Sequence, residues 1–267
     1  DRLDSPASRV GPDAALGWLE PDFDTSDWAG VVPSTSWAQG DPRPSEPAIL
    51  LRKEFIAPKP VIAARLYATA LGAYDARING QPVGKAILAP EISVASDHIL
   101  YQVHDVTDLI QPGMNAIGAT VGDGWYASPF GWRIERYGFG PAPRRFLAQL
   151  RLDYADGSCD WIRTGEDWRL MPSAISKSEI YDGETRDARF ELAGWDLTGF
   201  NESGWAPARR GTAPAVRLTA QTSPALERMG TRRALSVNEP KPGAHVFDFG
   251  QNFSGWVRIR AEGPAGT

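Results

Sequence analysis

Alternation of apolar and polar residues is the main pattern along this chain, and it predicts β-strands. The short segments that carry the pattern lie at 48–51, 61–67, 74–78, 117–121, 146–154 and 246–249. Turn dipeptides border several of them, as in antiparallel sheets: Asn79-Gly80, Pro112-Gly113 and Asp156-Gly157. No segment keeps a helical apolar period over three turns. The pattern therefore predicts an all-β protein.

The spacing of strands and turns fits antiparallel β-sandwiches of the jelly-roll type, two or more in number. The 267 residues exceed the roughly 150 residues of an average domain. We expect a wrapping segment at 1–45, a β-sandwich at 46–175, a connecting segment at 176–210 and the start of a second sandwich at 211–267. Because residues 263–267 read as a turn after a strand, we expect this second sandwich to be truncated.

One sequence pattern occurs twice, at 23–28 and at 200–205: Phe, Asp or Asn, any residue, Ser, any residue, Trp. Asp, Asn and Ser side chains close turns by hydrogen bonding to nearby backbone, and the two aromatic rings suit a hydrophobic core. We interpret both copies as structural anchors at domain openings.

Charge and composition narrow the classes of partner. The chain has 28 basic and 33 acidic residues, a net charge of −5, without a block of like charge. Nucleic acid and anionic membranes are therefore not expected partners. No apolar run approaches the roughly 18 residues that a membrane span needs. The single cysteine, Cys159, excludes an internal disulfide, and we expect it to be half-buried and inert.

The best local candidate for carbohydrate binding is the Gly-Asp-Gly-Trp-Tyr sequence at 122–126 with the nearby Trp132. Glycines let backbone approach a ligand, Asp123 offers a carboxylate to sugar hydroxyls, and Trp125, Tyr126 and Trp132 offer ring faces to a pyranose. The alternative is structural, because Trp125 follows a predicted buried strand and suits the core equally well.

Calcium is the one metal that these residues suggest, and no cofactor is required by the sequence. Calcium takes six to eight oxygen ligands, and the chain nominates only Asp123 and, less directly, Asp97. The three histidines are dispersed without metal-ligand spacing, so zinc is not expected.

A second polar cluster lies at 182–189 and comprises Asp182, Glu184, Arg186, Asp187 and Arg189. Inverting glycoside hydrolysis needs one protonated and one ionised carboxyl group. Neighbouring guanidinium groups lower a carboxyl pKa, which is the opposite of what a general acid needs. We interpret the cluster as a structural ion-pair network, with the rim of a substrate pocket as the alternative. No residue of this chain is predicted to be catalytic.

Three motifs together resemble the front half of bacterial α-L-rhamnosidases. The first runs from Leu66 to Gly80 and is followed by Gly-Asp-Gly-Trp-Tyr at 122–126. The second is Ile-Tyr-Asp-Gly-Glu-Thr-Arg-Asp-Ala-Arg at 180–189. The third is Val-Phe-Asp-Phe-Gly-Gln-Asn-Phe-Ser-Gly-Trp-Val-Arg-Ile at 246–259. The chain departs from the family pattern after Tyr126, where Ala-Ser-Pro-Phe stands in place of Gly and basic residues.

The resemblance implies a non-catalytic β-sandwich region of an inverting glycosidase. In that family an (α/α)6 barrel lies C-terminal to the Phe-Asp-Phe-Gly-Gln-Asn segment and carries the catalytic acids, so the barrel and its acids are expected to be absent from this chain. The whole enzyme would hydrolyse terminal α-L-rhamnose from glycosides or polysaccharides, with this C-terminal catalytic barrel as partner. The compartment, bacterial cytoplasm or periplasm, stays open.

Two other readings remain. The chain fits a stand-alone carbohydrate-binding module, with calcium as an optional ligand. It also fits a region that only mediates dimer contacts. Loss of sugar binding in a Trp125→Ala variant would favour a binding site at residues 122–126.

Overall fold

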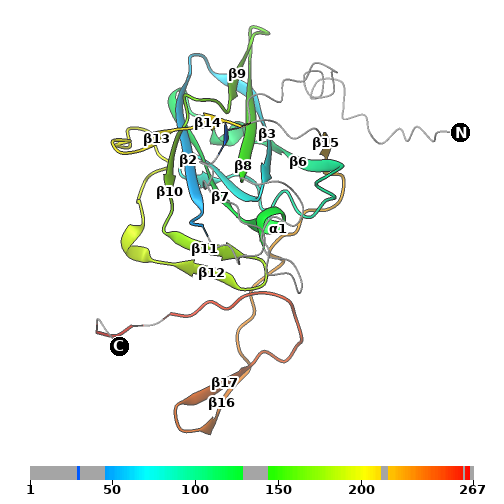
Figure 1. Ribbon diagram of the computed structural model, residues 1–267, viewed down its shortest axis with the longest axis vertical. Helices are drawn as coiled ribbons and strands as arrows, with labels where there is room; N and C mark the ends of the chain where they lie inside the picture. The colour runs from blue at the N-terminus through cyan, green and yellow to red at the C-terminus, as the bar shows by residue number, and fades with distance from the viewer. Residues whose placement is uncertain (1–28, 31–45, 129–143, 212–215, 261, 265–267) are drawn as a thin grey trace, which may run out of the picture. The chain divides into compact units, whose positions relative to one another are not determined.

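The computed structural model describes residues 29–30, 46–128, 144–211, 216–260 and 262–264. Contacts within the chain divide it into two compact units, unit 1 (Asp1–Glu227) and unit 2 (Arg228–Thr267). Unit 1 contains two large β-sheets that lie face to face (Figure 1). Within the described residues, helix is limited to α1 (Gly124–Ala127) and the short 3₁₀ turns η3 (Thr107–Leu109) and η4 (Ala188–Phe190).

The first sheet has seven strands in the order β14-β1-β8-β3-β6-β15, with β9 paired to β8. Its strands are β1 (Ala29–Gly30), β3 (Val61–Leu71), β6 (His98–Asp105), β8 (Arg145–Tyr154), β9 (Cys159–Arg163), β14 (Arg209–Arg210) and β15 (Arg217–Ala220). Strands β8 and β9 form a hairpin with Asp153 opposite Cys159, which confirms the turn expected at Asp156-Gly157. Strand β15 joins the edge by pairing in parallel with β6.

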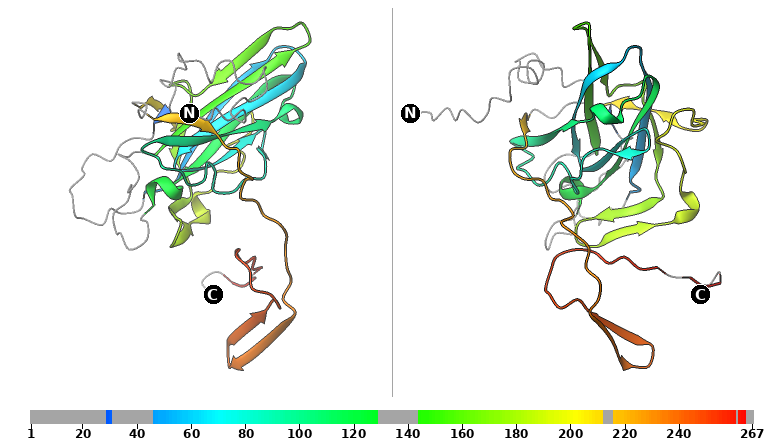
Figure 2. Two further views of the ribbon diagram at one scale, coloured as in Figure 1. Left: turned by 90° about the vertical axis from the view of Figure 1, so that its right-hand side faces the viewer. Right: turned by 180° about the vertical axis from the view of Figure 1, so that it is seen from behind.

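The second sheet has six strands in the order β13-β10-β2-β7-β4-β5. Its strands are β2 (Ile49–Ala57), β4 (Ala73–Ile78), β5 (Gln81–Pro82), β7 (Gly113–Gly122), β10 (Arg169–Pro172) and β13 (Ala206–Pro207). The pairs within this sheet are antiparallel. Figure 2 shows the two layers from the side and from behind.

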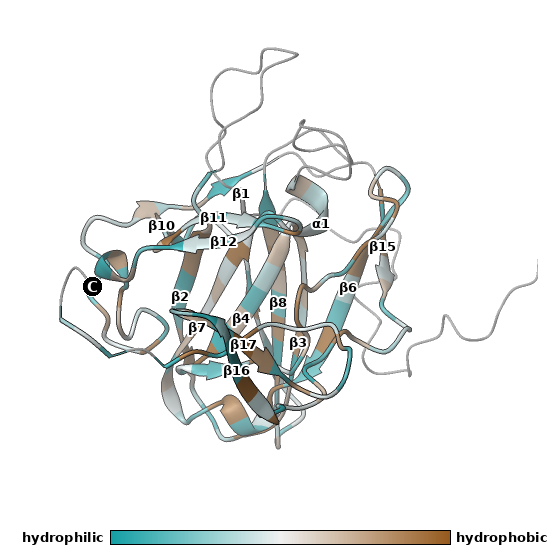
Figure 3. Ribbon diagram, turned by 90° about the horizontal axis from the view of Figure 1, so that it is seen from below, coloured by the Kyte–Doolittle hydropathy of each residue, from teal (hydrophilic) through white to brown (hydrophobic). Residues whose placement is uncertain are grey.

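The main core lies between the two sheets, and strand alternation explains it. Successive side chains of a strand point to opposite faces. In β8 every second residue enters the core: Phe146, Ala148, Leu150, Leu152 and Tyr154. Figure 3 shows the resulting interleaving of hydrophobic and hydrophilic residues along the strands. The expected all-β sandwich is therefore confirmed.

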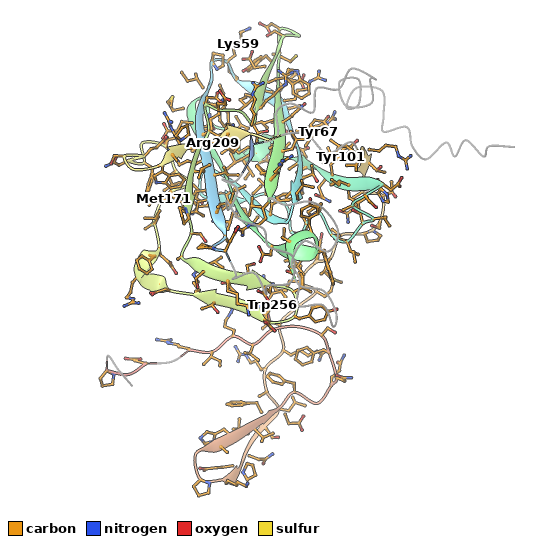
Figure 4. The ribbon with its side chains drawn as sticks, viewed as in Figure 1. Lys59, Tyr67, Tyr101, Met171, Arg209 and Trp256 are labelled. Carbon is orange, nitrogen blue, oxygen red and sulfur yellow. The ribbon has the colours of Figure 1, made fainter. Side chains whose placement is uncertain are left out.

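Both sheets are also covered in part on their outer faces. On the first sheet, the buried rings of Tyr67 and Tyr101, labelled in Figure 4, form a small cluster. Trp161 and Leu218 pack against this cluster. On the second sheet, the side chain of Arg52 is completely buried although it points away from the main core. A charged residue buried on this outer face implies an additional layer over β2.

That additional layer is formed by residues 173–202. It contains the antiparallel hairpin β11 (Ile175–Glu179) with β12 (Gly183–Arg186), followed by η4. Arg52 pairs with Glu202 and stacks on Phe200, whose ring lies 5.8 Å from Trp205 in an edge-on arrangement. The amide of Ser203 donates to the Asn201 side chain at 3.0 Å.

The second copy of the repeated pattern thus has the expected structure, a polar turn with aromatic anchors. The first copy, at 23–28, lies outside the described residues. Cys159 corrects the expectation of a half-buried thiol, because it is exposed beside the hairpin turn.

The described residues of unit 2 include a hairpin, β16 (Ser236–Lys241) with β17 (Ala244–Asp248). Its described residues include large exposed apolar side chains, Phe247 and Trp256 among them. Across the part of the chain that the structure describes, no helix is long and apolar enough to cross a membrane. The four-part division expected from the sequence stays a prediction, and its wrapping segment at 1–45 lies outside the described residues except for Ala29–Gly30.

Candidate functional site

The Gly-Asp-Gly-Trp-Tyr sequence lies where β7 ends and α1 begins. Gly124 has a φ of 53°, and a Cβ there would lie 2.5 Å from the Ala73 amide nitrogen. The turn therefore requires glycine. It directs Asp123 into the protein, where its side chain is fully buried.

Asp123 forms an ion pair with Arg144. The Arg144 Nη1 and Asp123 Oδ1 atoms lie 3.2 Å apart, and both side chains are almost completely shielded from water. Arg144 also donates to the carbonyl of Pro47 at 2.7 Å. A buried charge needs such a partner, because desolvation is costly. This geometry gives Asp123 a structural role, and its assignment to sugar or calcium stays a prediction.

The aromatic residues after Asp123 border a very small cavity. Trp125 and Tyr126 line a space of about 20 Å³, which suits a water molecule and not a pyranose. Tyr126 packs with Leu71 and Leu147, and burial raises the pKa of its hydroxyl. Trp132 lies outside the described residues. The sugar-binding assignment of these three aromatics also stays a prediction.

Asp97, the second calcium candidate, is exposed and already paired. Its carboxylate lies 3.0 Å from His98 Nδ1 and 3.2 Å from Arg217 Nη2. Hydrogen bonds from these two groups hold the pKa of Asp97 below its ordinary value. Among the described residues, no three His, Cys, Asp or Glu side chains come together as metal ligands.

The polar cluster at 182–189 forms ion pairs with short sequence separations. Asp182 pairs with Lys177 at 2.7 Å and Arg186 with Glu191 at 2.8 Å, while Asp187 pairs with Arg189. Hydrogen bonds from Lys177 and Arg189 lower the pKa values of Asp182 and Asp187 respectively. Neither carboxyl has the raised pKa that a general acid needs.

A larger cavity lies on the outer face of the second sheet. Here a groove of about 630 Å³ separates β2, β4 and β7 from residues 173–196, and we call it the outer groove. Ligand sites commonly measure roughly 300–1,000 Å³. Residues of the sheet that line it include Leu50, Asp75, Arg77 and Thr120. Residues of the opposite wall include Ser178, Glu184, Arg186, Trp195 and Asp196.

The outer groove is charged, and its cations are already paired. Arg77 Nε donates to Asp196 Oδ2 at 2.6 Å, and Arg186 pairs with Glu191. The contact of Asp75 with Arg77 is long, because 4.0 Å separates Asp75 Oδ2 from Arg77 Nη1. Glu184 forms no ion pair with the described residues. Two carboxylates thus remain available as hydrogen-bond acceptors.

Asp75 has an unusual environment for a surface carboxylate. Water reaches 63% of its side chain along the outer groove, yet protein lies on both sides. Burial between these walls raises the pKa of Asp75; the Arg77 guanidinium opposes this shift and the Asp196 carboxylate adds to it. The raised pKa and the location in a groove together mark a candidate site.

Trp195 is held against the sheet by close packing. A Cβ on Gly118 would lie 2.4 Å from Cζ3 of the Trp195 ring, so glycine makes this approach possible. The sequence alone does not indicate Asp75, Arg77, Trp195 or Asp196 as site residues. Alternation along β4 could have placed Asp75 and Arg77 on the outer face, because the intervening residues Tyr74, Ala76 and Ile78 are buried. No sequence pattern could have paired Arg77 with Asp196, which lies 119 residues away.

Comparison with known proteins identifies two matching regions. Residues 59–230 match the α-L-rhamnosidase N-terminal domain, and residues 238–267 match the bacterial α-L-rhamnosidase concanavalin-like domain. A curated α-L-rhamnosidase from Streptomyces avermitilis is 43% identical over 95% of this chain and 25% of its own length. One from Formosa agariphila is 33% identical over 75% of this chain and 21% of its own length.

Solved structures give the same result. The native α-L-rhamnosidase of Aspergillus terreus has a TM-score of 0.83 and 38% identity, covering 93% of this chain and 28% of its own. The Streptomyces avermitilis α-L-rhamnosidase complexed with L-rhamnose has a TM-score of 0.75 and 40% identity, and the match covers 89% of this chain and 24% of that enzyme. The chain spans about a quarter of the length of its curated relatives. It belongs to the α-L-rhamnosidase family and corresponds to the N-terminal domain region of that family.

Proposed function

We propose that this chain is the non-catalytic front part of an α-L-rhamnosidase that hydrolyses terminal α-L-rhamnose from glycosides or polysaccharides. The observation that carries the proposal is the 43% identity to a curated α-L-rhamnosidase across 95% of the chain. In this proposal a C-terminal catalytic barrel is the chain's partner within the same protein. The β-sandwich supports that barrel and borders its substrate.

The chemistry of the described carboxyl groups agrees with a non-catalytic role. Hydrolysis with inversion places two carboxyl groups about 6.5–9.5 Å apart, one of them a general acid with a raised pKa. Asp182 and Asp187 have lowered pKa values, and the Asp123 carboxylate is buried against Arg144. Asp75 has a raised pKa, but its neighbours Arg77 and Asp196 are already paired with each other.

Hydrolysis of an aryl α-L-rhamnoside tests the proposal. The purified 267-residue chain is expected to release no chromophore, whereas a protein that joins this chain to its catalytic barrel is expected to do so. Rhamnoside turnover by the chain alone would overturn the proposal. The alternative is a stand-alone carbohydrate-binding module with calcium as an optional ligand, in which the native protein carries no catalytic barrel and does not hydrolyse the rhamnoside.

A further inference from the structure

The outer groove has the size and lining of a small-molecule site, separate from the residues at 122–126 that the sequence suggested. We propose that it binds a neutral saccharide, with the sugar against Trp195 and its hydroxyls donating hydrogen bonds to Asp75 and Glu184. The inference rests on the proposed function only for the choice of an L-rhamnoside as the first sugar to test.

The size and small side chains of the outer groove provide room for a sugar ring. Its volume of about 630 Å³ is far larger than the cavity of about 20 Å³ beside Trp125. Much of the lining consists of small residues, including Ala73, Gly122 and Ala174. A pyranose can therefore approach the backbone without displacing large side chains.

The charges of the outer groove favour a neutral, hydroxyl-rich ligand over an anion. A phosphate or carboxylate ligand would need a free guanidinium, but Arg77 is bonded to Asp196 and Arg186 to Glu191. Ionised carboxylates only accept hydrogen bonds, and sugar hydroxyls are suitable donors. Asp75 and Glu184 are therefore the groups with unused capacity for a saccharide.

Trp195, which lines the outer groove, is fixed in position by contacts within the chain. Buried Arg52 donates from Nε to the carbonyl of Trp195 at 2.7 Å, and Gly118 lets the indole pack on β7. Asp196, the next residue, is bonded to Arg77 on β4. Preorganisation of this kind reduces the entropy lost on binding. An indole face beside hydrogen-bonding groups suits the apolar side of a pyranose.

The test is an NMR titration of the 267-residue chain with methyl α-L-rhamnoside. We expect saturable shifts of the Trp195 indole N–H and of the Thr120 and Ser178 amides. Asp75→Asn and Glu184→Gln should each weaken binding by about tenfold, the effect of losing a charge-assisted hydrogen bond. Glu166→Gln, an exposed carboxyl that does not line the groove, is the matched control and should bind like the parent chain.

Three results would overturn the inference. The first is the absence of any saturable shift in a parent chain with a dispersed, folded spectrum. The second is binding that persists unchanged in both Asp75→Asn and Glu184→Gln. The third is binding of glucosamine, whose ammonium group carries positive charge, without binding of the neutral rhamnoside. None of these results bears on hydrolysis by the joined protein, so failure of this inference is distinguishable from failure of the proposed function.

Discussion

The guanidinium of Arg52 donates a hydrogen bond from Nε to the backbone carbonyl of Trp195 at 2.7 Å, and the Arg52 side chain is fully buried. The same guanidinium bonds the carbonyl of Leu197 at 2.9 Å and pairs with Glu54 and Glu202. One side chain on β2 thus fastens the outer layer of residues 173–202 to the second sheet. The outer groove depends on this attachment.

Arg52→Met should destabilise the chain strongly. The substitution removes the Arg52 bonds to two carboxylates and two carbonyls, while Glu54 keeps the amide of Gly199 and Glu202 keeps Arg169. Breaking a buried ion pair costs about 3–5 kcal/mol. Urea unfolding should therefore show a loss of about 3 kcal/mol or more in the free energy of unfolding. Arg209→Met, at an exposed position of β14, is the matched control. An equal effect of the two substitutions would contradict the attachment role of Arg52.

The buried pair of Asp123 and Arg144 should behave as one unit. Asp123→Asn removes the buried carboxylate that pairs with Arg144 and leaves Glu46, 3.5 Å away, as its other carboxylate. Arg144→Met removes the guanidinium from the buried Asp123 carboxylate, so each substitution should cost about 3 kcal/mol. The double variant should cost less than the sum of the single variants, with a coupling of about 1 kcal/mol or more in a double-mutant cycle. Simple additivity would show that the 3.2 Å contact contributes nothing to stability.

Gly118→Ala tests the packing of Trp195. The added Cβ would lie 2.4 Å from the indole ring and 3.0 Å from the carbonyl of Leu51. Overpacking of this kind costs about 1–3 kcal/mol, and the Trp195 indole N–H resonance should move as the ring is displaced. Gly230→Ala, where nothing lies within 4 Å of the added Cβ, is the control. An unmoved Trp195 resonance would contradict the described packing.

Asp75 should make stability depend on pH in a defined direction. Its pKa in the folded chain is raised above the ordinary 3.8, so the folded chain holds this proton more tightly than the unfolded chain does. The resulting stability is present at low pH and is lost as pH rises through the raised pKa. Asp75→Asn removes this loss because the side chain stays neutral.

The stability of Asp75→Asn relative to the parent should therefore be greater at about pH 7 than at about pH 3.5. Unfolding by urea at both pH values measures this difference. Glu166→Gln serves as the exposed control. A relative stability of Asp75→Asn that falls with rising pH would show that Arg77, not burial, dominates the environment of Asp75.

The sequence predicted the local features of the fold because these depend on neighbouring residues. Alternation in 146–154 identified β8, and Asp156-Gly157 identified the hairpin to β9. The polar turn of the second repeated pattern was also predictable, since Asn201 and Ser203 are two residues apart. The family resemblance followed from the motifs at 122–126, 180–189 and 246–259.

The sites were less predictable because they combine residues that are distant in sequence. The glycines around Asp123 suggested an accessible loop, but Arg144, which follows much later in the sequence, pairs with this buried carboxylate. The outer groove combines Asp75 of β4 with Glu184 and Trp195 of the outer layer. Strand alternation predicts which face of the sheet a residue occupies. It does not predict which other segment of the chain covers that face.

The most direct test of the proposed function is the rate at which the purified chain hydrolyses 4-nitrophenyl α-L-rhamnoside. The account predicts no rate above the buffer blank, for the parent chain and for Asp75→Asn alike. A measurable rate that is lost in Asp75→Asn would place catalysis in this chain and contradict the account.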